Sequence, residues 1–132
     1  MKYPLTELVK AYYDALSSIL PVYDGQAPDD SAGSYIILGE RVLIPQQDKN
    51  NFFNEIMLVI DVVTKQYGTG FKVNSGYVDD ITAIINQGTL LTMPSFKMDN
   101  QVIESIQTLN DLTDKEKVFR TIIRVRSYIT EK

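Results

Sequence analysis

The chain has 132 residues, 44% of them apolar, with 13 Lys and Arg against 17 Asp and Glu, for a formal net charge of -4. This length is typical of one domain, and we expect residues 1–132 to form a single domain. Because the sequence contains no cysteine and no histidine, it excludes disulfides, thiolate nucleophiles and the commonest general base and transition-metal ligand, so we expect no enzymatic activity, metal site or cofactor.

The first predicted element is a helix over residues 4–20, which Pro21 ends. Its apolar residues recur at spacings of three and four and form one stripe: Leu5, Leu8, Tyr12, Leu16 and Ile19. A short strand is expected around Val22 and Tyr23. The segment over residues 24–33 is rich in Asp, Pro and Gly, which predicts an exposed loop.

The next segment, residues 34–44, is rich in β-branched and aromatic side chains but is interrupted at Gly39, Glu40 and Arg41. Two interpretations remain open, a single bulged strand and two short strands. We favour a strand over residues 34–39 whose continuation over 41–44 bends. Residues 45–50 are polar and are expected to form a hairpin connection.

Residues 51–64 form the strongest predicted strand. Apolar residues occupy both alternating sets, which indicates a central strand covered at least partly on both faces. The two sets are Ile56, Leu58, Ile60 and Val62, and Met57, Val59 and Val63.

A second helix is predicted over residues 77–87, after turn-rich residues 74–76. Its apolar residues fall at helical spacing: Val78, Ile81, Ile84 and Ile85. Asp79 and Asp80 would lie in the first turn, where the helix dipole favours negative charge.

The pattern in the last third of the sequence predicts two strands, over residues 102–108 and 118–129, joined by a turn at 110–116. Alternation in the second strand places one apolar set, Phe119, Thr121, Ile123, Val125 and Ile129, opposite a basic set, Arg120, Arg124 and Arg126. The sequence therefore predicts an α+β fold, a mainly antiparallel sheet of four to five strands with two helices packed on one side, in the order helix-strand-strand-strand-helix-strand-strand.

Three interpretations of the arginine cluster are open. The side chains could pair locally with Glu104 and Asp61 on adjacent strands, pair with acidic residues of a neighbouring subunit, or contact phosphates. We favour local pairing. The net charge of -4 argues against binding nucleic acid through the whole surface.

Two other patterns resemble ligand sites only superficially. Residues 68–72 contain two glycines and a lysine but lack phosphate-loop spacing, and no predicted helix begins directly after them, so they are expected to connect a strand to a helix. Asp24, Asp29 and Asp30 lack the alternating spacing and closing Glu of a calcium loop, so we expect an exposed acidic loop.

The element order and several short motifs carry a resemblance to a known family. The motif residues are Val22, Tyr23, Asp24, Pro28, Ser34, Tyr35, Ile36, Ile37, Leu38, Gly39 and Glu40. A central strand at residues 55–63, a helix at 77–87 and an arginine-bearing last strand follow in order. The chain thereby resembles the small tail-completion or tail-terminator proteins of tailed phages, although those proteins often carry a tryptophan and this chain has none.

The resemblance implies a structural virion protein that forms a homo-oligomeric ring at the head-tail junction or neck, ends the tail or joins it to the portal or connector, and lets DNA pass without specific binding. It implies a virion assembled in the host cytoplasm, with no membrane contact. The alternative is a small cytoplasmic protein-binding or regulatory module that uses its sheet face. The candidate interface residues are Arg120, Arg124, Arg126, Asp24, Asp29, Asp30, Gln46, Gln47 and Asp48.

Overall fold

The computed structural model describes residues 4–26, 33–47, 52–66, 72–87, 93–112 and 117–131. The elements, in chain order, are α1 (Leu5–Leu16), β1 (Val22–Asp24), β2 (Ser34–Gln47), β3 (Phe52–Gln66), α2 (Lys72–Gln87), β4 (Phe96–Leu112) and β5 (Lys117–Glu131). The predicted order of elements and the α+β class are confirmed.

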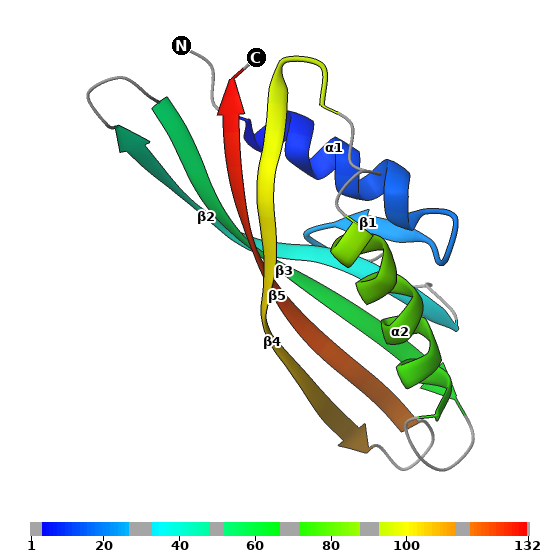
Figure 1. Cartoon of the computed structure of the whole chain (residues 1–132). Helices are drawn as coiled ribbons and strands as arrows, with labels where there is room; N and C mark the ends of the chain where they lie inside the picture. Colours follow the sequence, from blue (N-terminus) through cyan, green and yellow to red (C-terminus); the bar gives the residue numbers. More distant parts are fainter. Residues whose placement is uncertain are drawn as a thin grey trace.

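The strands form one twisted five-stranded sheet with the order β1-β2-β3-β5-β4 (Figure 1). All neighbouring strands are antiparallel except β1 and β2, which run parallel. Both helices lie on the same side of this sheet, as predicted. The strand β3 lies in the centre, between β2 and β5, and its predicted central position is confirmed.

The core lies between the two helices and one face of the sheet, which we call the helix face. Alternation brings one set of apolar side chains of β3 and β5 to this face, and each is at most 1% exposed: Ile56, Leu58, Ile60, Val62, Ile123, Val125 and Ile129. The helices contribute Leu8, Tyr12, Leu16, Ile81 and Ile85 to the same cluster. Burial of each large apolar side chain contributes roughly 1.5 to 3 kcal/mol, so this layer dominates stability.

The first helix is shorter than predicted: it ends at Leu16 and not at residue 20. The hydroxyls of Ser17 and Ser18 donate to the carbonyl oxygens of Asp14 and Ala15, at 3.3 and 3.4 Å. Leu20 is nevertheless only 8% exposed, so the apolar pattern continues through the turn that follows the helix.

The strand β2 is continuous and bulged, with a register shift between Leu38 and Arg41. The bend expected near Gly39 is therefore confirmed. The strand continues to Gln47, so the predicted hairpin connection over residues 45–50 begins too early. Beyond Leu38 no described strand pairs with the outer edge of β2, where an exposed Pro45 can be accommodated without losing a sheet hydrogen bond.

The second helix begins at Lys72 and not at Tyr77, so residues 74–76 are helical and Asp79 and Asp80 lie beyond the first turn. The prediction that no helix begins directly after residues 68–72 is wrong for the same reason. The side chain of Asn74 is bonded to the sheet, and these tertiary hydrogen bonds outweigh the turn preference of the segment. Residues 67–71, most of the predicted connection, lie outside the described residues.

Both C-terminal strands extend beyond their predicted bounds, since β4 spans Phe96–Leu112 and β5 spans Lys117–Glu131. Residues 110–112 of the predicted turn are part of β4, and residues 113–116 lie outside the described residues. The predicted faces of β5 are confirmed, because Phe119, Thr121, Ile123, Val125 and Ile129 are all buried.

Tyr12 joins α1 to the two C-terminal strands. Its hydroxyl lies 3.4 Å from Ser127 Oγ on β5 and accepts a hydrogen bond from Gln101 Nε2 on β4. Burial raises the pKa of Tyr12 from 10.0 to about 12, against the smaller, opposite effect of the two hydrogen bonds.

This pKa predicts a loss of stability at alkaline pH. The unfolded chain releases the Tyr12 proton near pH 10, whereas the folded chain holds it to about pH 12. The stabilisation is therefore complete below pH 10, and the free energy of unfolding should fall by roughly 2 to 3 kcal/mol on going to pH 12.

Urea titrations across this pH range measure the effect. The Tyr12→Phe variant should show a correspondingly weaker pH dependence, and Tyr13→Phe, at an exposed neighbouring position, provides the matched control. Equal pH dependence in wild type and Tyr12→Phe would contradict the assignment to this hydroxyl.

Candidate interface on the open sheet face

The face of the sheet opposite the helices is not covered by any described element (Figure 1), and we call it the open face. Several large apolar side chains lie on it and remain accessible; Val42 is 56%, Ile44 45% and Val102 40% exposed. Between them lie the half-buried Met57, Val59 and Ile122. Exposed apolar side chains on an uncovered sheet face are typical of a protein interaction surface.

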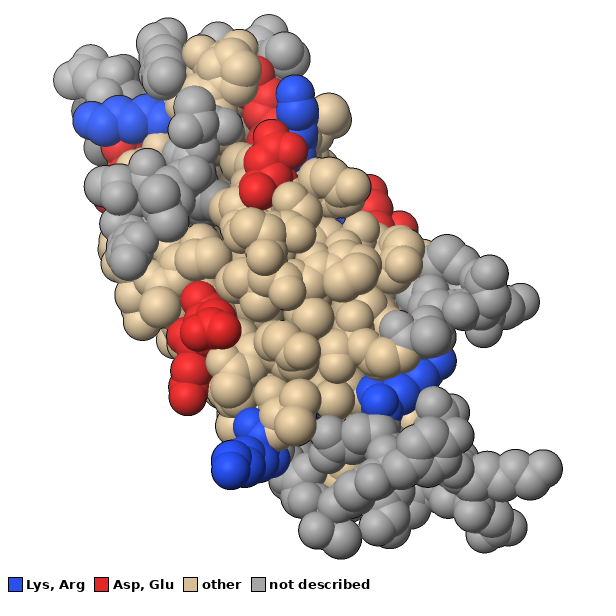
Figure 2. Space-filling view, turned by 90° about the vertical axis from the view of Figure 1, so that its right-hand side faces the viewer, with Lys and Arg blue, Asp and Glu red and all other residues tan. Residues whose placement is uncertain are grey.

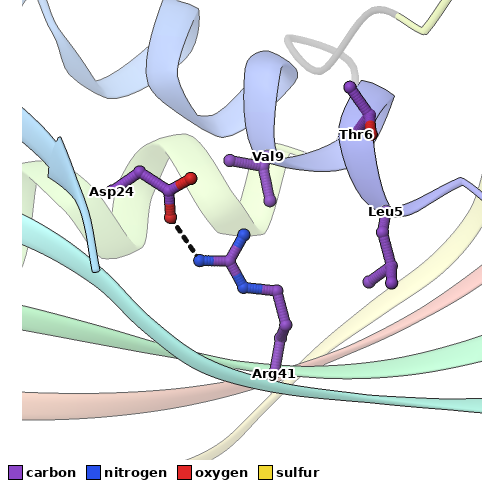
Figure 3. Close-up of a pocket in the computed structure, with 5 residues that line it drawn as sticks. All are labelled: Leu5, Thr6, Val9, Asp24 and Arg41. Carbon is purple, nitrogen blue, oxygen red and sulfur yellow. Dashed lines mark hydrogen bonds and ion pairs between the residues drawn. The ribbon is translucent and has the colours of Figure 1, made fainter.

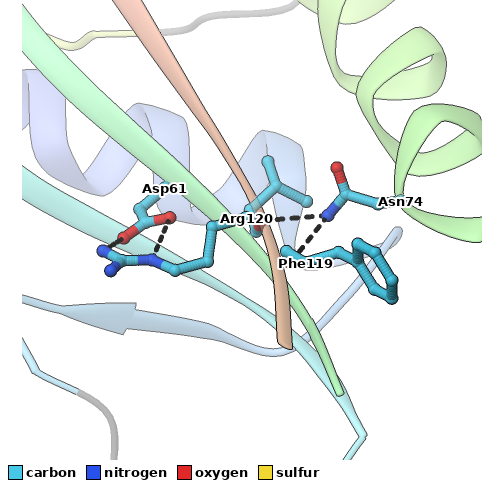
Figure 4. A network of polar contacts seen from close by, with 5 residues as sticks. Asp61, Asn74, Phe119 and Arg120 are labelled. Atoms are coloured by element: carbon cyan, nitrogen blue, oxygen red, sulfur yellow. Dashed lines mark hydrogen bonds and ion pairs between the residues drawn. The ribbon is translucent and has the colours of Figure 1, made fainter. Parts of the chain in front are cut away.

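Arg120 of β5 pairs with Asp61 of β3 on this face (Figure 4). The guanidinium uses two nitrogens: Nε lies 3.4 Å from Asp61 Oδ1, and Nη2 donates to Oδ2. Asp61 is only 7% exposed, so the pair neutralises a carboxylate that would otherwise be buried alone.

Arg126 joins three strands through two further ion pairs. Its Nη1 lies 2.9 Å from Glu55 Oε1 on β3, and its Nε lies 2.9 Å from Glu104 Oε1 on β4. A hydrogen bond with Tyr128 raises the pKa of Arg126 above its ordinary value, and both carboxylates act in the same direction. This side chain is therefore charged at every physiological pH.

Arg124 lies on β5 between Arg120 and Arg126, and its surroundings differ from theirs. Its cross-strand neighbours are Val59 on β3 and Ser105 on β4. Within the described ranges it forms no ion pair. Arg124 is a half-buried residue that carries a cation on a partly apolar face.

The favoured prediction of local pairing is therefore confirmed for two of the three arginines, with the predicted partners Asp61 and Glu104. Glu55 was missed, although it lies directly opposite Tyr128 and so diagonally beside Arg126. The cross-strand register, which the sequence did not give, would have identified it.

Asp24 lies apart from the arginine cluster. It forms an ion pair with Arg41 on the helix side of the sheet, beside Leu5, Thr6 and Val9 of α1 (Figure 3). Arg41 also donates to the carbonyl oxygens of Gly39 and Leu38, at 3.3 and 3.2 Å. The ion pair connects the bulge of β2 to the end of β1, and the two hydrogen bonds hold the Arg41 side chain against the bulge.

The other predicted interface residues are only partly described. Gln46 and Gln47 end the strand β2, so they belong to a sheet edge and not to a connection. Asp29, Asp30 and Asp48 lie outside the described residues.

A buried polar network under the sheet was not predicted. Asn74 of α2 is 0% exposed, and its Nδ2 lies 3.1 Å from Val62 O, 3.1 Å from Thr64 Oγ1 and 3.2 Å from Phe119 O (Figure 4). Thr121 Oγ1 donates to Asn74 Oδ1. The network attaches α2 to β3 and β5 behind the Asp61 and Arg120 pair, and thereby fixes the backbone on which the open face is built.

Charge is unevenly placed on the remaining surface. The side of the molecule that lies on the right in Figure 1 has a middle without charged side chains among its described residues, and Lys, Arg, Asp and Glu lie around it (Figure 2). Over the described ranges, acidic side chains nowhere gather into a group able to hold a metal ion, and no helix has the length and apolar character needed to span a membrane.

Comparisons with known proteins identify a shared fold. Neither a protein-family model nor a curated protein sequence matches the chain. Among solved structures, a chain of the structure described as "Virion of native gene transfer agent (GTA) particle" is similar, with a TM-score of 0.70 and 18% sequence identity. The similarity covers 99% of this chain and 100% of that chain, so the two chains share one fold from end to end.

Proposed function

We propose that this protein is a structural subunit of a phage virion and forms a ring at the head-tail junction or neck. In this role it ends the tail or joins it to the portal or connector. The observation that carries the proposal is the end-to-end similarity in fold to a chain of a gene transfer agent virion particle. The resemblance of element order and motifs to tail-completion and tail-terminator proteins narrows the proposed position to the junction.

The open face supports an assembly role. A ring subunit needs two different lateral surfaces, because head-to-tail contacts between unlike surfaces close a cycle. The apolar open face with its arginines supplies one such surface. The partners proposed are further copies of this chain and the adjoining neck, portal, connector or tail proteins.

The negative net charge of the chain supports a role in which DNA passes through the ring. A formal net charge of -4 disfavours tight contacts with phosphates, so DNA could slide through the ring without being held. We place acidic residues toward the lumen or neighbouring rings; of those predicted, Asp29, Asp30 and Asp48 lie outside the described residues. The role is non-enzymatic, and it requires neither a metal nor a cofactor.

Deletion of the gene from the genome that encodes it tests this function. We expect electron microscopy to find DNA-filled heads and separate tails, some longer than normal, because neither tail ending nor joining can occur. Expression of the protein in trans should restore joined particles. Normal joined particles without the protein would contradict the proposal and would favour a cytoplasmic regulatory role.

A further inference from the structure

We propose that the open face of one copy binds the outer side of helix α2 of a second copy, with Arg124 opposite Asp80. The outer side of α2 is defined here by Val73, Gly76, Asp79 and Asp80. This inference rests on the proposed function and deepens it, because it names the contact between neighbouring ring subunits.

The open face specifies the chemistry of what covers it. Arg120 and Arg126 already have carboxylate partners, whereas Arg124 has none among the residues described. Covering an unpaired guanidinium removes its hydration, which is costly unless the covering surface brings a carboxylate. Since Val59 and Ile122 flank Arg124, a complementary surface offers an acidic group for Arg124 and apolar contact beside it.

The outer side of α2 combines an exposed apolar side chain with two acidic side chains. Val73 is 48% exposed, and Asp79 and Asp80 are exposed and form no ion pair within the described part of the chain. With Lys72, Gly76 and Tyr77 these residues line a shallow open depression of about 690 Å³. A Cβ placed at Gly76 would meet nothing within 4 Å, so a partner can approach the helix closely there.

The two surfaces lie on opposite sides of the molecule. Val78, Ile81 and Ile85 turn the inner side of α2 to the helix face, so its outer side points away from the sheet and the open face points in the other direction. Complementary surfaces on opposite sides generate head-to-tail contacts, which form a ring when the rotation from one subunit to the next closes. The contact would also cover the open face with a helix, giving the sheet helical layers on both faces.

Dimensions and charge favour this occupant over direct contact between two open faces. The 16-residue helix α2 is about 24 Å long and can cross the sheet formed by the 15-residue strands β3 and β5. Two open faces meeting around a two-fold axis near Arg124 would instead bring Arg124 of one copy toward Arg124 of the other. Like charges placed together across an interface oppose association.

Thiol cross-linking tests the contact, and only the introduced thiols can react because the chain has no cysteine. The probe is a double variant, Gly76→Cys on α2 and Ser105→Cys on β4, which is exposed and lies directly opposite Arg124 in the sheet. Concentrated protein treated with a short bismaleimide should form a ladder of linked chains that ends at the size of the ring. The control pair, Gly76→Cys with Ser17→Cys on the exposed end of α1, should remain mainly monomeric.

Two results would overturn the contact. Dimers formed by Ser105→Cys alone would show that open faces meet each other, and absence of a ladder above the control pair would show that α2 does not reach the open face. Neither result concerns the deletion phenotype, so the ring function and this contact can fail separately.

Charge reversal in the cross-linking variant identifies the ion pair. Arg124→Glu or Asp80→Arg alone should lower the ladder yield about tenfold or more, because each places like charges together, and the two combined should restore it. Lys10→Glu, an exposed reversal on α1, should leave the yield unchanged. If the combined variant gives no recovery, Arg124 binds a different partner, such as a phosphate, and the pairing is wrong.

Discussion

The Asn74→Ala variant should have a free energy of unfolding about 3 to 4 kcal/mol lower than wild type. The substitution removes a fully buried side chain that donates to the carbonyl oxygens of Val62 and Phe119 and to Thr64, and that accepts from Thr121. The large effect is expected because the partners stay buried without the amide, and a buried polar group left unpaired costs roughly 1 to 3 kcal/mol.

The matched control is Asn86→Ala, on an exposed position of the same helix. Urea unfolding should place its stability within about 0.5 kcal/mol of wild type. If Asn74→Ala were equally mild, the network would not be what attaches α2 to the sheet.

Two adjacent isoleucines on β5 should respond oppositely in stability and assembly. Ile123 is 0% exposed on the helix face, and its replacement by alanine should cost about 3 to 4 kcal/mol through lost burial and a residual cavity. Ile122 lies on the open face and is half-buried, so Ile122→Ala should cost only about 1 kcal/mol in the monomer. Chemical unfolding of both variants measures the difference.

Ile122→Ala, the milder substitution for stability, should have the clearer effect on assembly. In the cross-linking background, Ile122→Ala should reduce the ladder because Ile122 flanks Arg124 at the proposed contact. Equal destabilisation by both substitutions would mean that the two faces of β5 are equally buried in the monomer. An unchanged ladder with Ile122→Ala would remove Ile122 from the contact.

Alternating strands were the most predictable part of the fold. On β5, the apolar set identified the buried side, and the arginines were placed correctly on the opposite side. Both sets of β3 are apolar and predicted cover on both faces, whereas no described element covers the open face. A strand period of two allows only two faces, so a strongly patterned strand determines its own orientation. The local partners Asp61 and Glu104 followed from the same logic.

Element ends were less predictable, because contacts distant in sequence determine them. Asn74 favours a turn locally, yet four hydrogen bonds to β3 and β5 make it part of α2. The polar residues 45–50 suggested a connection, but Pro45 lies at an edge of β2, where its missing N-H group is tolerated. Neither circumstance can be read from neighbouring residues.

The structure separates the predicted interface residues for a related reason. The sequence grouped Asp24 with the arginines as an interface residue, whereas the fold pairs it with Arg41 beneath α1. Residues 72–76, which include part of the proposed contact on α2, were predicted to form a connection and a turn and not a helix. Arg124 differs from Arg120 and Arg126 because those two residues form ion pairs with nearby carboxylates. The cross-strand register determines which carboxylates lie near each arginine.

The proposed function makes this chain a ring subunit at the head-tail junction of a phage-like particle. Electron cryomicroscopy of that junction, in particles that carry the protein, is the most direct measurement. We expect a closed ring of copies around the DNA channel, with α2 of each copy lying on the open face of the next. A junction without any copy of this chain, or copies present only as isolated monomers, would contradict the claim.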